Sequence, residues 1–181
     1  MVFHFMRHGQ TDHNKDGILQ GHLDTALNER GKAQVFEAVK TLRAHEFDLV
    51  IASPLKRAYE TGRIVAQEID APLQVNPHLR ERTFGELDGM SFAQIRTLHP
   101  DFWEIIRRDD GRVTPGCETL EEVEHRLRAF IEELRPLGQS KKILVVSHGA
   151  TGRILHKLIN RDEAFHEFEI ENCKIIEFEL D

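Results

Sequence analysis

Two His-Gly pairs are the residues of this chain best suited to chemistry. His8 stands between Arg7 and Gly9, and His148 stands between Ser147 and Gly149. An imidazole can act as a nucleophile or exchange a proton near neutral pH. Guanidinium groups bind phosphate through paired hydrogen bonds, and Arg57 adds a second one to Arg7. These residue types favour phosphoryl chemistry over binding of a neutral ligand.

The elements that must position these residues are three predicted strands, over residues 2–6, 48–52 and 142–147. Each is a continuous apolar run, which is typical of strands buried on both faces. The two His-Gly pairs and the Arg57 segment follow these runs directly. Because the carboxyl ends of parallel strands meet at one edge of a sheet, we expect the two histidines and two arginines to converge there.

Helical patterns separate these strands. We expect helices from Asn28 to about His45, from an N-cap at Ser53 with Pro54 in the first turn to about Ile69, from a capping box at 119–122, and after Gly149. Arg57 then lies among the free N–H groups of a helix start, which favour an anion. Weaker strand patterns cover residues 73–75, 168–171 and 174–180, the last two alternating as edge strands do.

Alternating strands and helices predict a three-layer α/β/α sandwich with a mostly parallel central sheet and helices on both faces. The 181 residues suffice for a single domain, 1–181, without a linker or an internal repeat. Residues 91–114 form an irregular helical excursion, which we expect to lie over the site as a lid or specificity insertion. Within it, Arg107 and Arg108 are candidates to contact a second anionic group, although an exposed charged helix face explains them equally.

Composition excludes several classes of protein. The net charge is −7, and there is no block of Lys or Arg, which argues against nucleic acid or an anionic membrane as the main partner. No apolar run approaches the roughly 18 residues that span a bilayer. The first residues show no basic segment followed by a long apolar stretch, so we expect a cytoplasmic protein. Cys117 and Cys173 have no metal or redox spacing and are expected to be reduced thiols.

The motifs also occur in the order found in a known family. The chain resembles the histidine phosphatase superfamily, in its phosphoglycerate-mutase-like branch (branch 1), over nearly its whole length. The matching segments are Arg7-His8-Gly9-Gln10-Thr11 with Asn14, Gln20-Gly21, residues 27–31, 53–61 and 79–85, Pro115-Gly116-Cys117-Glu118-Thr119, and residues 145–149. The sequence departs from the usual family pattern at Gln10, His13, Asp88 and Cys117.

The resemblance implies a role for each matching residue. His8 would be the nucleophile that forms a phosphohistidine, and Glu81 would be the acid and then the base. Arg7, Arg57 and His148 would hold the phosphoryl oxygens, with His148 working best when protonated. The implied substrate-binding residues are Asn14, Gln20, Gly21 and Thr11. The resemblance implies neither a metal nor a cofactor, and the two adjacent arginines would repel a cation.

Structural explanations exist for each of these residues. His8 and His148 fit buried histidines at strand ends, and Arg7 or Arg57 fits an ordinary ion pair or a solvated helix charge. Glu81 stands between Arg80 and Arg82 and could form a surface ion pair, worth ~0–1 kcal/mol. Asn14 could belong to a turn. These explanations do not account for the convergence of all the motifs.

We therefore expect a cofactor-independent phosphatase that hydrolyses a phosphomonoester, with a small phosphorylated metabolite as its substrate. A phosphoglycerate mutase using the same site is the first alternative, and a non-catalytic module that binds a phosphorylated ligand is the second. The sequence does not name the substrate. It also leaves the oligomeric state open, and the alternating C-terminal strand offers an edge for a homodimer.

Overall fold

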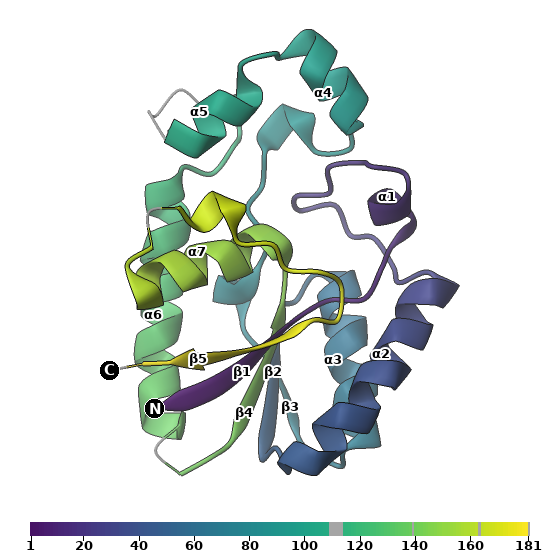
Figure 1. Ribbon diagram of the computed structural model, residues 1–181, viewed down its shortest axis with the longest axis vertical. Helices are drawn as coiled ribbons and strands as arrows, with labels where there is room; N and C mark the ends of the chain where they lie inside the picture. The colour runs from purple at the N-terminus through teal and green to yellow at the C-terminus, as the bar shows by residue number, and fades with distance from the viewer. Residues whose placement is uncertain (109–113, 139, 163, 181) are drawn as a thin grey trace.

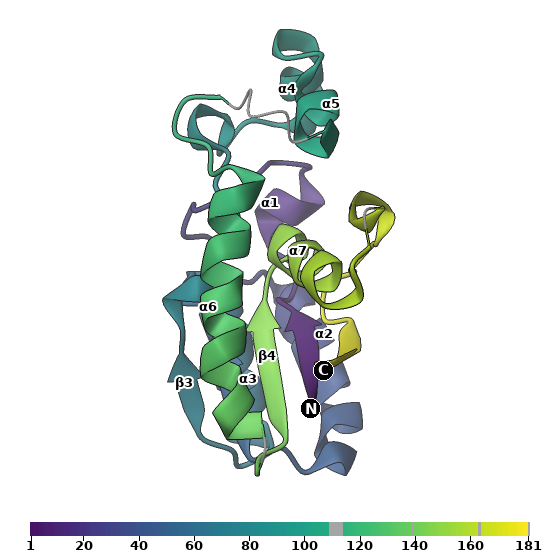
Figure 2. The same ribbon diagram turned by 90° about the vertical axis from the view of Figure 1, so that its left-hand side faces the viewer.

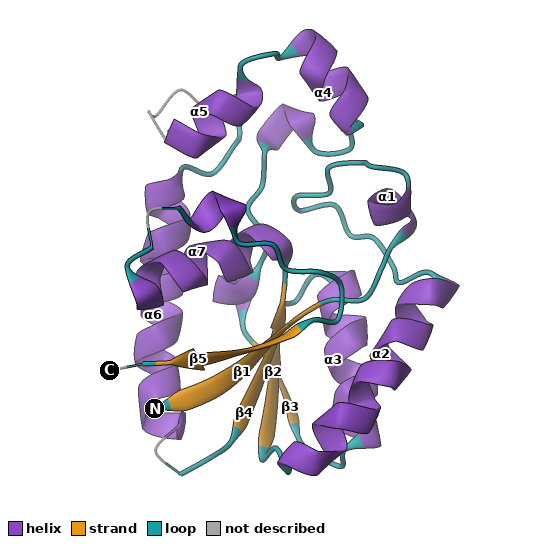
Figure 3. Ribbon diagram, viewed as in Figure 1, coloured by secondary structure: helices purple, strands orange, loops and turns teal. Residues whose placement is uncertain are grey.

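A five-stranded sheet forms the centre of the protein in the computed structural model, which describes residues 1–108, 114–138, 140–162 and 164–180. The strand order is β3-β2-β4-β1-β5 (Figures 1 and 3). The four strands β1 (Val2–Arg7), β2 (Leu49–Ala52), β3 (Leu73–Val75) and β4 (Ile143–Ser147) are parallel, whereas β5 (Ile175–Glu179) pairs antiparallel with β1 at one edge.

Helices cover both faces of this sheet, which confirms the predicted three-layer architecture. The helices α2 (Glu29–Leu42) and α3 (Lys56–Glu68) pack on one face, and α6 (Leu120–Gly138) and α7 (Gly149–Asn160) pack on the other (Figures 1 and 2). Alternate residues of the central strands enter the two cores. In β4, Ile143 and Val145 face α6 and α7, while Leu144 and Val146 face α2 and α3. This burial on both faces explains the continuous apolar runs.

Several helix starts agree with their sequence signals. The Asn28 side chain accepts from the Gly31 amide at the start of α2, which ends at Leu42 and continues as the 3-10 turn Arg43–His45. Thr119 and Glu122 form the predicted capping box at α6. The helix α3 differs, because it begins at Lys56 with Leu55 as its N-cap residue and no side-chain cap. Ser53 is not the N-cap residue, and its hydroxyl contacts both the Leu55 amide and His148.

The predicted strand at residues 168–171 is wrong. A 3-10 turn, Phe165–Glu167, precedes this segment, which then crosses the end of β1 without joining the sheet. Its backbone has another partner, because the Ile170 carbonyl accepts from Arg7 Nη1 at 2.7 Å. The strand predicted over residues 174–180 is confirmed as the edge strand β5.

A smaller group of elements lies beyond the carboxyl ends of the strands, at the top of Figure 1. It consists of α1 (Asp12–Lys15), α4 (Phe92–Leu98), α5 (Phe102–Arg108) and the turn Gly85–Leu87, whereas the turn Pro77–Leu79 follows β3 and packs against α6. A separate small core of Phe84, Leu87, Ile95 and Phe102 holds α4 and α5 in place. No described helix is long and apolar enough to cross a membrane.

Candidate active site

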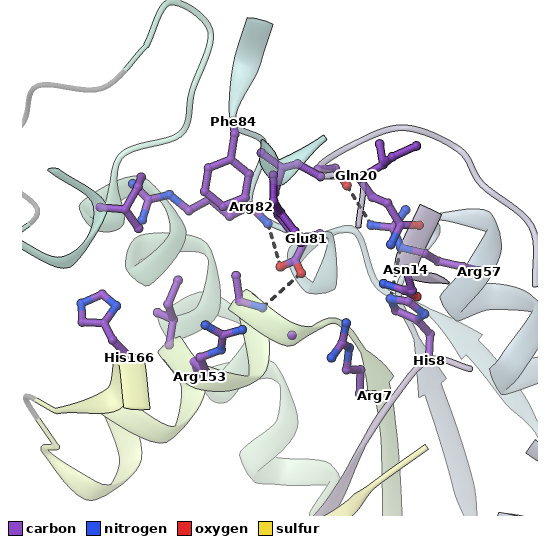
Figure 4. A pocket seen from close by; sticks show the side chains of 18 of the residues that line it. Arg7, His8, Asn14, Gln20, Arg57, Glu81, Arg82, Phe84, Arg153 and His166 are labelled. Atoms are coloured by element: carbon purple, nitrogen blue, oxygen red, sulfur yellow. Dashed lines mark hydrogen bonds between the residues drawn. The ribbon is translucent and has the colours of Figure 1, made fainter. Parts of the chain in front are cut away.

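A pocket opens at the carboxyl ends of β1 and β4, beneath α4 and α5. Its empty volume, counting the part open to solvent, is about 860 Å³. Figure 4 shows the side chains that point into it. Of the residues predicted for the site, the lining includes Arg7, His8, Asn14, Gln20, Gly21, Arg57 and Glu81.

His8 is held in one tautomer by its neighbours. Its Nδ1 lies 2.7 Å from the carbonyl oxygen of Gly9, so this nitrogen carries the proton and donates it. The other nitrogen, Nε2, then keeps its lone pair and accepts from Arg57 Nε at 3.2 Å. Burial, with Arg57 and Arg7 close by, holds the pKa of His8 well below its ordinary value. A neutral imidazole with a free lone pair is the form that a nucleophile requires.

Gly9 lets the backbone turn tightly after His8. A Cβ at this position would lie 2.7 Å from the carbonyl oxygen of Gly31 at the start of α2. The Gly9 amide donates to Thr61 of α3 at 3.1 Å. The missing side chain therefore allows α2 and α3 to fix the loop that carries the imidazole.

The two predicted arginines have different surroundings. Arg57 is 1% exposed, and its Nη1 and Nη2 donate to the carbonyls of Leu23 and Gly21 at 2.7 and 2.8 Å. Together with its bond to His8, these contacts use three of its five N–H donors, so two remain for a ligand. Burial lowers the pKa of Arg57 to about 10, with Glu81 opposing the shift. Arg7 is anchored by its bond to Ile170, while its Nε is buried without a hydrogen-bond partner.

His148 lies beside His8, with ring centroids 5.2 Å apart. Its Nε2 is 2.7 Å from the Ser53 hydroxyl, and its Nδ1 is buried with no hydrogen-bond partner. Ser53 Oγ also accepts from the Leu55 amide, and its single proton can be donated to Nε2 of His148. Burial, with Arg57, His8 and Arg7 nearby, holds the pKa of His148 well below its ordinary value.

This environment changes the expectation that His148 works best when protonated. When Ser53 donates to Nε2, the single proton of a neutral ring lies on Nδ1. His148 can therefore donate a hydrogen bond without carrying a charge, and two charged imidazoles need not lie side by side. His148 itself is fully buried and is not among the residues that line the pocket.

Glu81 stands on the opposite wall of the pocket, and it is not the surface ion pair that its neighbours in the sequence could suggest. Its two carboxylate oxygens accept from the backbone amides of Ala150 and Thr151 at 3.1 and 2.9 Å, and from the Thr151 hydroxyl at 3.1 Å. The Arg82 amide adds a fourth bond at 3.0 Å. The carboxylate thus caps the start of α7, the helix that follows His148 (Figure 4).

Thr11 organises the other predicted binding residues. It is fully buried and does not line the pocket; its hydroxyl donates to Gln20 Oε1 at 2.8 Å and to Asn14 Oδ1 at 3.2 Å. Asn14 occupies the third position of the capping box of α1, and its Nδ2 has no partner within the part of the chain that is described. This amide is available to a ligand. Gly21 has φ +45° and supplies the carbonyl that binds Arg57.

Several lining residues were not predicted. Phe84, Phe92, Trp103 and Ile106 form an apolar wall, and Arg153 and His166 approach from the α7 side (Figure 4). Helical spacing could have predicted Arg153 as a lining residue, because it lies four residues after Gly149 and hence on the same face of the helix. The side chains of Arg107 and Arg108 lie outside the described part of the protein. Among the described residues, no cluster of three or more His, Cys, Asp or Glu could hold a metal ion.

Comparison with known proteins decides the family. The family model of the histidine phosphatase superfamily (branch 1) matches residues 3–181. The chain belongs to this superfamily. A solved mycobacterial glucosyl-3-phosphoglycerate phosphatase, in complex with VO3, superposes on this histidine phosphatase fold with a TM-score of 0.90 at 26% identity, covering 97% of this chain and 90% of that one.

Curated relatives agree with this assignment. An adenosylcobalamin/alpha-ribazole phosphatase of Escherichia coli is 31% identical over 169 residues, which cover 92% of this chain and 83% of the relative. A glucosyl-3-phosphoglycerate phosphatase of Mycolicibacterium vanbaalenii is 30% identical over 152 residues, 80% of this chain and 67% of the relative. Both relatives are phosphatases, and the chain is accordingly a histidine phosphatase, a hydrolase.

Proposed function

We propose that this histidine phosphatase hydrolyses a small phosphomonoester through a phosphohistidine on His8, without a metal or an organic cofactor. The observation that carries the proposal is the state of His8. Its proton is held on Nδ1 by Gly9, and its Nε2 lone pair faces a pocket with Arg7 and Arg57. Glu81 lies across the same pocket. A nucleophile, cationic donors and an acid therefore surround one space.

In the first step, the Nε2 lone pair of His8 attacks phosphorus and forms a P–N bond. The P–O bond to the organic group breaks, and the leaving oxygen takes a proton from Glu81. The incoming phosphoryl group replaces the contact between Nε2 and Arg57. Arg7, Arg57, Asn14 and the Nδ1–H of His148 donate to its oxygens, where charge accumulates in the transition state.

In the second step, the Glu81 carboxylate takes a proton from a water molecule. The water oxygen attacks phosphorus, the P–N bond breaks, and inorganic phosphate leaves. The four hydrogen bonds on Glu81 keep its carboxylate at the pocket wall through both steps. Thr11 and Gln20 act through Asn14 and the adjoining loop, as positioning residues that support the binding of phosphate.

A phosphoglycerate mutase would use the same residues and return the phosphoryl group to an organic hydroxyl. A phosphoglycerate mutase-like protein of Arabidopsis thaliana is among the relatives, 30% identical over 157 residues, 84% of this chain and 68% of the relative. Phosphatase names among the relatives favour transfer to water. Dependence on added 2,3-bisphosphoglycerate would distinguish a mutase.

The test is hydrolysis of p-nitrophenyl phosphate and a phosphomonoester panel in excess EDTA by the wild type and by His8→Ala. We expect activity that survives EDTA and falls by at least about 10⁴-fold in the variant, because the covalent route is lost. Acid-quenched wild-type protein should retain labelled phosphate, and His8→Ala should not. The matched control is His99→Ala in the segment between α4 and α5, which should keep full activity.

Other outcomes would point elsewhere. Activity that disappears in EDTA, or that persists in His8→Ala, would contradict the proposal. Label on His8 without release of phosphate to water would support the mutase. A protein that binds phosphate but shows neither turnover nor label would be a binding module.

A further inference from the structure

The pocket carries more positive charge than one phosphoryl group needs. Arg7, Arg57, Arg82 and Arg153 all line it, and Glu81 is the one carboxylate among the described lining residues. This accumulation occurs in a chain whose net charge is −7. Arg57 and Arg7 are bonded to the carbonyls that hold them, and Arg82 donates to the Glu118 carbonyl at 2.8 Å. Arg153 differs from these three arginines in its hydrogen bonding.

Arg153 has no hydrogen-bond or ion-pair partner among the described residues, and its Nε is fully buried. It lies close to a second cation. A Cβ on Gly149 would lie 3.5 Å from Cζ of Arg7 and 3.8 Å from Nη2 of Arg153, so both guanidinium groups border the space left by one missing side chain. The positive charge of Arg153 also lowers the pKa of Arg7.

Two neighbouring guanidinium groups, with buried nitrogens that lack partners, are unfavourable in an empty pocket. Desolvation leaves their hydrogen-bond donors unsatisfied, and their like charges repel one another. An anion beside Arg153 would satisfy its donors and offset the repulsion from Arg7, and guanidinium is the side chain best suited to carboxylate or phosphate. The arrangement is therefore a binding site for an anion.

The position of Arg153 separates this anion from the phosphoryl group under attack. That phosphoryl group must lie against Nε2 of His8. In Figure 4, Arg7 lies between His8 and Arg153, and Arg153 lies on the side of His166. An anionic group beside Arg153 is consequently a different part of the substrate, a few atoms away from the scissile phosphate.

We propose that Arg153 is a specificity-determining residue that binds a second anionic group of the substrate, either a carboxylate or a second phosphate. The proposal rests on the proposed phosphatase function of this pocket. The apolar wall of Phe84, Phe92, Trp103 and Ile106 faces the remaining organic part and limits access of water. Because this wall is apolar, the attraction between the Arg153 guanidinium group and the anion is stronger than it would be in water.

The test uses three substrates that share one skeleton. Glycerol 3-phosphate carries only the scissile phosphate, 3-phosphoglycerate adds a carboxylate at the other end, and glycerol 1,3-bisphosphate adds a phosphate there. We measure kcat/KM of the wild type for each. At least one substrate with two anionic groups should be preferred over glycerol 3-phosphate by roughly 10- to 100-fold, the range expected for a charge-assisted bond. The preferred one identifies the second group.

Variants then assign the preference to one residue. Arg153→Gln removes the charge and keeps much of the side-chain length, and it should abolish most of the preference by raising KM for the doubly anionic substrate. Arg153→Lys keeps the positive charge but lacks the planar guanidinium group. It should retain part of the preference for the doubly anionic substrate. The matched control is Arg63→Gln on the exposed side of α3, where the side chain donates to Gln67, and it should leave the preference unchanged.

Failure of this proposal is distinguishable from failure of the phosphatase function. Hydrolysis of p-nitrophenyl phosphate that depends on His8, without a preference for either doubly anionic substrate, would overturn the role of Arg153 alone. A wild-type preference that Arg153→Gln retains would overturn it as well. No hydrolysis of any substrate would refute the phosphatase function, and the proposal would fall with it.

Discussion

At the scale of single residues, neighbouring groups decide what each side chain of the site can do. Gly9 and Arg57 leave His8 with a lone pair on Nε2, whereas a proton donated by Ser53 to Nε2 of His148 leaves an N–H on Nδ1. The roles that we propose for the two imidazoles, nucleophile and hydrogen-bond donor, rest on this difference. Both are buried, and the pKa of each lies well below its ordinary value, so neither needs to change its charge for these roles near neutral pH.

The first prediction concerns Glu81. In Glu81→Gln the shape is preserved, but no proton can be given to the leaving oxygen. We expect kcat for an alkyl phosphomonoester to fall by roughly 10²- to 10⁴-fold, the usual contribution of a general acid. The loss on p-nitrophenyl phosphate should be smaller, because nitrophenolate leaves without a proton. Steady-state kinetics on both substrates checks this.

Glu86→Gln is the control for this comparison, since Glu86 is exposed and lies five residues away in the same loop. It should retain wild-type kinetics. Equal losses on the two substrates in Glu81→Gln would show that Glu81 acts by holding α7 in place and not as an acid.

At the scale of elements, the segment before β5 completes the site from the far end of the chain. Asn172 Nδ2 donates to the His8 carbonyl at 2.8 Å and lies 3.5 Å from Asn14 Oδ1. The Cys173 amide donates to the Arg7 carbonyl at 2.9 Å, and the Ile170 carbonyl accepts from the Arg7 side chain. This segment therefore fixes both the nucleophile loop and Asn14.

The second prediction is that Asn172→Asp lowers kcat by about tenfold, since loss of one donor to a buried carbonyl costs about 1–3 kcal/mol and 1.4 kcal/mol corresponds to tenfold. Asp has the same shape but cannot donate when ionised. Lys174→Ala, on an exposed side chain nearby, is the control. A structural role alone would lower the melting temperature and leave kcat of the folded protein unchanged. Kinetics at a temperature where both variants are fully folded separates these results.

At the scale of the whole molecule, buried neutral histidines couple stability to pH. His8 and His148 are joined by His4, which packs against His45 and Phe47 at the opposite end of β1. Burial, with His45 nearby, lowers the pKa of His4, while Glu177 opposes the shift. In the unfolded chain each of these side chains would titrate near its ordinary value of about 6.5.

The third prediction follows from the sign of these shifts. Below pH about 6.5 the unfolded chain binds protons that the folded chain does not, so the free energy of unfolding should decrease as the pH falls from 7 to 5. Each histidine that stays neutral when folded contributes up to about 1.4 kcal/mol per pH unit. Denaturant unfolding at several pH values measures this slope. His148→Gln should make it shallower, and Arg63→Gln should leave it as it is.

A slope that His148→Gln does not change would show that this ring takes up a proton in the folded protein. The prediction would then fail for His148, and its role as a neutral donor would fail with it.

The sequence by itself determined the architecture and most of the chemistry. Apolar runs, helix caps and His-Gly pairs are local patterns, and parallel strands necessarily bring their carboxyl ends together. His8, Arg7 and Arg57 could therefore be assigned to one pocket from their places at the ends of predicted elements, whereas Glu81 was assigned through the family resemblance. The family match over residues 3–181 confirms the resemblance on which their roles were based.

The tertiary structure decided what depends on contacts between distant residues. The helix α3 begins at Lys56, and Ser53 contacts His148, 95 positions away. Residues 168–171 do not join the sheet, and the Ile170 carbonyl accepts from the Arg7 side chain. The surroundings of Arg153 were likewise not encoded locally, since they depend on Gly149 packing beside the side chain of Arg7. Propensity and periodicity describe neighbours in the chain. Tautomers, pKa shifts and unpartnered charges arise from neighbours in space.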